Sequence, residues 1–166
     1  ETLDDDQFAD RVTEWALNRD NLLKIIPLVK ERVDVFSQLA PMISFFAEGM
    51  PELSPESFKV KNVEEEDVKK ILQFSLWRLE AQTRWERDPL KQLFNDLAES
   101  LGLKIRDVLA PIFVAISGKP VAPPLFDSMA ILGPDICRAR LRHALNTLGG
   151  VSKKQVKRLE KEYKEL

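Results

Sequence analysis

The side chains that carry most enzyme chemistry are scarce in this chain of 166 residues. Its one histidine, His143, lies in a basic run that begins at Arg138 and has the pattern of a surface or half-buried helix. Its one cysteine, Cys137, has no second cysteine with which to form a disulfide or share a zinc ion. We expect Cys137 to pack as a small apolar core residue. Carboxylate runs such as Glu64–Asp67 favour a helix start, where the dipole is positive, over an acid–base pair.

Known site patterns are absent as well. No carboxylate–histidine cluster has the ligand spacing of a zinc or di-iron site. The glycines form neither a P-loop nor a dinucleotide-binding pattern. The sequence therefore predicts no catalytic residue and no metal site in this chain, and it favours binding over catalysis.

Charge is distributed unevenly along the chain. Residues 1–103 hold 13 Lys/Arg and 21 Asp/Glu, a net charge of −8, whereas residues 104–166 hold 12 Lys/Arg and 6 Asp/Glu, a net charge of +6. The basic side chains of the second part recur in three groups: Lys104/Arg106, Arg138/Arg140/Arg142 and Lys153/Lys154/Lys157/Arg158. This part could face phosphates; the alternative is a solvated helix surface with internal ion pairs.

Composition indicates a soluble folded protein, with 44% hydrophobic and 31% charged residues. No apolar run approaches the roughly 20 residues of a membrane helix, and the acidic start, Glu1 to Asp6, lacks the features of a signal peptide. We expect a cytoplasmic chain with no membrane association.

Apolar residues recur at helical spacing along almost the whole chain, which predicts an all-α fold. Two N-terminal helices should bury these faces: Phe8, Val12, Trp15 and Ala16, then Leu22, Leu23, Ile26 and Val29. A third helix is expected over 34–47, a long one over about 64–84, and another from Asp88 to Gly102. Ser152 and Gln155 should form the capping box of a last helix.

Prolines become frequent after Gly102 and the expected helices shorten, which indicates a second subdomain. We therefore divide the chain into a first helical subdomain over 1–85, a second over 86–150 and a terminal helix over 151–166.

One run of the chain has a specific resemblance to a known family. Residues 103–132 read LKIRDVLAPIFVAISGKPVAPPLFDSMAIL, which resembles the stretch that characterises the last domain of bacterial glutamyl-tRNA synthetases. Residues 105–118 and 123–127 keep most of the family pattern, the segment 25–34 is similar to an upstream family segment, and Trp85 fits before a helix start. The similarity is strongest over 85–148 and weakest over 150–166.

The resemblance implies an α-helix cage of two subdomains that holds the anticodon loop of glutamate tRNA. The family's HIGH and KMSKS signatures belong to an upstream Rossmann-like catalytic domain that binds ATP, and neither occurs here. The chain therefore looks like a C-terminal fragment of a glutamate–tRNA ligase, without a cofactor and inactive in aminoacylation by itself. The implied partners are tRNA(Glu) and the upstream catalytic domain, and we expect a monomer.

Arg32 occupies the position where the resemblance places an arginine that reads the third anticodon base. A planar guanidinium has a fixed fork of donors that suits a base edge with two acceptors. The alternative is a surface arginine paired with Asp34.

The loop Ala122-Pro123-Pro124-Leu125 matches the family loop that packs against the first two anticodon bases. Prolines stiffen it, so that less entropy is lost when it captures a flexible nucleotide. A plain turn between helices is the alternative. Two positions depart from the family pattern: Ala122 replaces the usual Ser/Thr, and Phe113 stands where many relatives carry arginine. Phe113 is expected either to stack on a base or to belong to the core.

A second hypothesis from a different class remains open. An all-α chain with an acidic N-terminal two-thirds could be a helical protein–protein interaction module without an RNA role.

Overall fold

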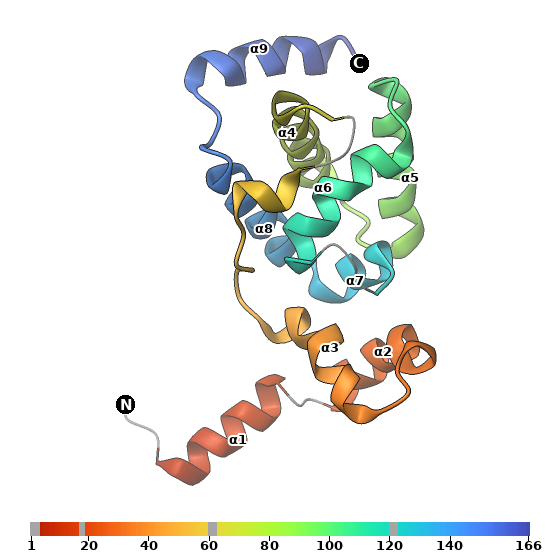
Figure 1. Cartoon of the computed structure of the whole chain (residues 1–166), viewed down its shortest axis with the longest axis vertical. Helices are drawn as coiled ribbons and strands as arrows, with labels where there is room; N and C mark the ends of the chain where they lie inside the picture. The colour runs from red at the N-terminus through yellow and green to blue at the C-terminus, as the bar shows by residue number, and fades with distance from the viewer. Residues whose placement is uncertain (1–3, 17–18, 60–62, 120–122) are drawn as a thin grey trace. The chain divides into compact units, whose positions relative to one another are not determined.

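The computed structural model describes residues 4–16, 19–59, 63–119 and 123–166, except for the side chains of Val12, Trp15 and Ala16. Within these ranges the chain is all-α and contains no strand, which confirms the predicted fold class (Figure 1). Packing divides the chain into two compact units, residues 1–49 and 50–166.

Among its described residues, the first unit contains three α-helices and two short 3-10 turns. They are α1 (Asp5–Ala16), α2 (Arg19–Val29), η1 (Lys30–Arg32), η2 (Phe36–Gln38) and α3 (Leu39–Ala47). Helices α2 and α3 pack together and bury Ile25, Val29 and Phe45. Pro41 lies in the first turn of α3, where its missing N–H has no intrahelical acceptor to lose.

The apolar faces predicted for this unit are only partly buried. Phe8, expected to face inward on α1, is 61% exposed, and Leu23 of α2 is also exposed. The other three residues of the predicted α1 face, Val12, Trp15 and Ala16, lie outside the described side chains. In α2 the buried positions are Ile25 and Val29, one helical turn apart.

The second unit contains a short 3-10 turn and six α-helices among its described residues. They are η3 (Pro55–Phe58), α4 (Glu65–Ala81), α5 (Arg87–Ser100), α6 (Ile105–Ser117), α7 (Leu125–Leu132), α8 (Pro134–Thr147) and α9 (Lys153–Lys164). Helix α4 is the central element, because six consecutive residues from Ile71 to Leu76 are buried. It packs most extensively on α8 and also contacts α5 and α6.

Packing places the division between the units at Gly49/Met50, whereas the sequence pattern predicts a subdomain boundary at 85/86. The difference has a physical cause. Helix α4 supplies core residues such as Leu72 and Leu79 to the same cluster as Leu90 of α5 and Leu141 of α8. The division at 85 and 150 stays a prediction about the parts that hold RNA.

Several helix ends have the structure that their residue types predict. At the start of α9 the Ser152 hydroxyl accepts the Gln155 N–H at 3.3 Å, while the Gln155 side chain accepts the Ser152 N–H at 2.8 Å. This is the predicted capping box. Ser54 and Pro55 likewise open η3, with the Ser54 N–H donating to the Ser57 hydroxyl at 3.4 Å.

Gly118 ends α6 in the left-handed conformation, with φ +68°. Its N–H donates to the Val114 carbonyl at 2.8 Å. A Cβ at this position would lie 2.9 Å from the Cβ of Pro51, closer than real Cβ contacts. Glycine is therefore required here twice, by the backbone conformation and by the close approach of the Pro51 ring.

Cys137 is fully buried in the core of the second unit, which confirms its predicted role as a small apolar residue. Its thiol lies 3.7 Å from the Met129 carbonyl. Burial away from water raises the pKa of the Cys137 thiol to about 12, against smaller opposing effects of Arg140 and Arg138.

The close approach at Gly118 predicts a difference between two glycine substitutions. Gly102 is also left-handed, with φ +63°, but nothing lies within 4 Å of a Cβ built there. Both Gly→Ala changes should cost the conformational strain of roughly 1–2 kcal/mol. Gly118→Ala should destabilise the protein by about 1 kcal/mol more, because Pro51 must shift. Urea unfolding of both variants measures the difference, and equal losses would contradict the packing described here.

The buried thiol predicts slow alkylation. Because the thiolate is the nucleophile, a thiol with a pKa near 12 and no exposed surface should react with iodoacetamide at pH 8 only when the second unit opens. The measured rate should rise by orders of magnitude in denaturing urea. A rate in native buffer close to that of free cysteine would show that Cys137 is accessible.

Candidate nucleic-acid interface

The predicted site residues lie in both units. Arg32 belongs to the first unit, while Phe113 and the segment Pro123–Leu125 belong to the second, and each group is described within its own unit. Ala122 lies outside the described residues.

Arg32 is exposed and ends the short turn η1. The chain then becomes extended at Val33 (φ −122°, ψ 127°), so that Arg32 stands at a break between helices. The N–H of Asp34 is taken up by the Gln38 side chain at 2.8 Å, which fixes the start of the next turn, η2. An exposed guanidinium on a turn that is held at its base suits contact with a ligand from solvent.

A hollow of about 270 Å³ lies among the residues that flank Arg32. Its lining is mainly apolar, with one cation and one carboxylate: Ile26, Lys30, Val33, Asp34, Val35, Phe36 and Leu39. The Phe36 side chain is 91% exposed, and Val35 is also exposed. An exposed aromatic ring at the edge of an apolar hollow offers a flat surface on which an unpaired base can stack.

Phe36 was not among the residues that the sequence pattern singled out. Phe36 fell within the helix expected over 34–47, whereas the structure places it in η2, before α3 begins at Leu39. Helical spacing predicts which residues face a core; it does not predict that an aromatic residue in a break stays exposed.

Several contacts hold the end of α6, which precedes in sequence the segment Pro123–Leu125, named here the diproline segment. The Ser117 hydroxyl lies 2.8 Å from the Phe113 carbonyl and 2.9 Å from the Lys119 carbonyl, and it accepts the Lys119 N–H at 3.2 Å. Arg140 donates to the Ile116 carbonyl from a fully buried position. These contacts, with Gly118 against Pro51, fix the direction in which the chain leaves α6.

The diproline segment is anchored on its other side by α7. Pro123 is buried and Pro124 is half-buried, and the Pro124 carbonyl accepts both the N–H and the hydroxyl of Ser128, at 3.0 and 2.8 Å. The Leu125 side chain is 5% exposed and belongs to the core. Any contact that a ligand makes at Leu125 must therefore come from its backbone, while its side chain holds the segment on the unit.

Phe113 packs against the core of the second unit and keeps part of its ring exposed. It was expected either to stack on a base or to belong to the core. Its packing supports a structural role, and part of the residue stays accessible to solvent.

The three arginines of α8, which the charge pattern made candidates for phosphate contact, are engaged within the unit. Arg138 donates through Nη2 and Nε to the Leu79 carbonyl, at 2.8 and 3.1 Å, and lies over the Trp85 ring at 5.5 Å. Arg140 is buried against Ile116, and Arg142 pairs with Glu80. The guanidinium groups of Arg138 and Arg140 satisfy carbonyls at the ends of α4 and α6, which have no intrahelical donors.

Trp85, which the resemblance placed before a helix start, stands two residues before α5. Its indole N–H donates to the Met129 carbonyl of α7 at 2.8 Å. Together with Arg138, this indole links the start of α5 to α7 and α8.

Neither a metal site nor a membrane-spanning helix is found in the part of the chain that the structure describes. No group of three or more His, Cys, Asp or Glu side chains there is placed to hold a metal ion. No described helix is long and apolar enough to cross a membrane.

The chain is similar to one protein family over most of its length. A family model described as "Anticodon binding domain" matches residues 7–145. The chain is 49% identical over 166 residues to a glutamate–tRNA ligase of Marinomonas sp. (strain MWYL1), covering 100% of this chain and 34% of that protein. It is 47% identical over 163 residues to a glutamate–tRNA ligase of Marinobacter nauticus, covering 98% of this chain and 33% of that protein. The chain thus spans about a third of the length of these curated relatives.

A solved structure shares the fold. It is the crystal structure of a glutamate tRNA ligase from Elizabethkingia meningosepticum in complex with its amino acid, which aligns with a TM-score of 0.68 at 24% sequence identity. The alignment covers 84% of this chain and 28% of that one.

Proposed function

We propose that this chain, which belongs to the anticodon-binding domain family, recognises the anticodon loop of glutamate tRNA and positions that tRNA for a catalytic domain of the same, longer protein. The observation that carries the proposal is the similarity of the entire chain, at 49% identity, to a third of a glutamate–tRNA ligase. We infer that the parent protein is a glutamate–tRNA ligase and that the remaining two-thirds of its length carries out the ATP-dependent reaction.

Arg32 is the residue that we propose reads the third anticodon base. It is exposed at the break after η1, and a guanidinium can donate two parallel hydrogen bonds to one base edge. The adjoining hollow, with Phe36 at its edge, suits a base that has left its stack, because apolar and aromatic surfaces replace the lost stacking.

The diproline segment is proposed to contact the other two anticodon bases. Pro123 and Pro124 lack N–H donors and are held on both sides, by the turn 117–119 and by Ser128. A segment fixed before binding loses little entropy when it meets a flexible loop. Its contacts are therefore apolar or made through backbone carbonyls.

Selective binding of tRNA is the first test. We expect this chain to bind glutamate tRNA more tightly than other tRNAs, with an affinity that falls as salt rises, because phosphate contacts release counterions. Fluorescence titration with glutamate tRNA, glutamine tRNA and one unrelated tRNA at three salt concentrations measures both effects. Equal affinity for all three would contradict anticodon reading, and no binding to any would favour a protein–protein module.

Arg32→Gln tests the specificity contact. The variant should lose about 1–3 kcal/mol of discrimination between glutamate and glutamine tRNA, the usual value of one bidentate base contact. Arg11→Gln is the matched control, since Arg11 is an exposed arginine of α1 paired with Glu14. The same titrations apply to both variants. Discrimination that survives in Arg32→Gln, or falls equally in both, would remove Arg32 from the site.

A further inference from the structure

Helix α9 presents a stripe of five lysines to solvent. Lys153, Lys154, Lys157, Lys161 and Lys164 are all exposed. At 3.6 residues per turn they fall within an arc of about 100° on the helix circumference. The arc is centred opposite Leu159, the buried residue of this helix, and the two acidic residues of α9, Glu160 and Glu162, fall outside it.

The opposite side of α9 is anchored on the unit. Leu159 is 4% exposed, and the Tyr163 ring packs against the rings of Phe74 and Trp77, with centroids 5.1 and 5.2 Å apart. Glu162 pairs with Lys70 of α4 at 2.7 Å. The apolar face of this amphipathic helix is therefore already covered by the protein, which removes the means by which such helices enter a membrane.

The charge of the stripe is not balanced by its surroundings. Helix α9 has five lysines and one arginine against two glutamates, a net charge of +4, while the whole chain has −2, so the rest carries −6. Arg158 pairs with Glu66 and Glu162, at 3.6 and 3.7 Å. Among the described residues no carboxylate lies within ion-pair distance of the five lysines. A local positive surface on an acidic protein attracts a polyanion to one place, while the rest of the chain does not bind polyanions nonspecifically.

We propose that the lysine stripe of α9 binds the phosphate backbone of the tRNA whose anticodon the rest of the chain reads. The inference rests on the proposed function. From Lys153 to Lys164 the helix rises about 16 Å, a length over which a duplex strand carries about five phosphates at the roughly 3.4 Å spacing of DNA. The number of lysines matches that number of charges.

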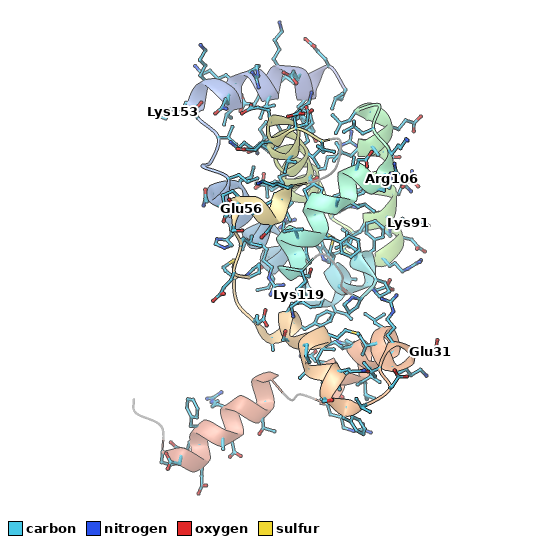
Figure 2. The ribbon with its side chains drawn as sticks, viewed as in Figure 1. Glu31, Glu56, Lys91, Arg106, Lys119 and Lys153 are labelled. Carbon is cyan, nitrogen blue, oxygen red and sulfur yellow. The ribbon has the colours of Figure 1, made fainter. Side chains whose placement is uncertain are left out.

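The stripe meets phosphates outside the anticodon loop. Within the second unit, α9 lies at one end, and α7, which follows the diproline segment, lies at the other (Figure 1). Figure 2 shows the same separation for two labelled residues, Lys153 at the start of α9 and Lys119 at the end of α6. A loop held at Pro123 and Pro124 therefore does not extend to α9, and the backbone of the flanking RNA is what the stripe contacts.

The chemistry of lysine sets what this contact contributes. An ammonium group is a point charge without the planar fork that reads a base edge. Contacts to phosphates hold the register of the RNA and carry no sequence information. The stripe therefore adds affinity for every tRNA equally, and it differs in this from Arg32. The match to the family model ends at residue 145, so the stripe lies beyond the part that the family model describes.

The test replaces three stripe lysines, Lys154, Lys157 and Lys161, by glutamine in the full chain. Because these side chains are exposed and glutamine is as good a helix former as lysine, the thermal midpoint should stay unchanged. Affinity for glutamate, glutamine and unrelated tRNA should fall by the same factor, about tenfold at low salt, and the slope of log affinity against log salt should decrease by about 3. The single variant Lys157→Gln should lower that slope by about 1.

The matched control replaces three other exposed basic residues of the second unit, Lys59, Arg84 and Lys91, by glutamine, which changes the net charge equally. It should leave the affinity within about twofold and the slope nearly unchanged. If the two triple variants had equal effects, overall charge would explain the binding and the proposed role of the stripe would be refuted. Unaltered affinity and slope in the stripe variant would also refute it. If wild-type chain showed no preference for glutamate tRNA while the stripe variant still weakened binding of all tRNAs, the proposed anticodon reading would fail and the stripe would stand.

Discussion

The second unit depends on a buried cation at the end of a helix. Arg140 has no exposed surface, and a charge removed from water is tolerated only when its donors are satisfied. It donates to the Ile116 carbonyl, at the C-terminal end of α6 where the helix dipole is negative and carbonyls lack partners. The cation and the helix end thus satisfy one another. The turn 117–119 follows at once, so this contact also holds the point at which the chain leaves α6.

Two other basic side chains of α8 also donate to backbone carbonyls of neighbouring segments. One turn before the end of the helix, His143 donates through Nε2 to the Pro51 carbonyl at 3.0 Å, and the Pro51 ring in turn lies under Gly118. Near its start, Arg138 donates to the carbonyls of Leu79, in the last turn of α4, and of Gln82, which follows α4. The basic run of α8 is therefore a scaffold that fixes three chain segments around the core. By contrast, the five lysines of α9 face solvent.

The sequence predicted elements well and the roles of long polar side chains less well. Spacing at 3.6 residues identified α4 and α5, and Ser152 with Gln155 identified the start of α9, because these signals are local. The direction taken by Arg138 and Arg140 depends on which helix end lies opposite, and a single chain does not encode that in its periodicity. Leu125 and Phe36 show the same limit, since one is buried within an expected binding loop and the other is exposed beside Arg32. Packing groups α4 with the helices that follow it, because six consecutive residues of α4 are buried, and the subdomain boundary at 85 stays a prediction.

The central claim is that this chain contacts the anticodon bases of glutamate tRNA, and base-specific chemical footprinting tests it most directly. Reagents that modify the Watson–Crick edges of unpaired bases should react with all three anticodon bases of free glutamate tRNA. Saturating amounts of this chain should protect those three bases, while the anticodon of an unrelated tRNA at the same concentration stays reactive. Bound glutamate tRNA whose anticodon bases remain fully reactive would contradict the account.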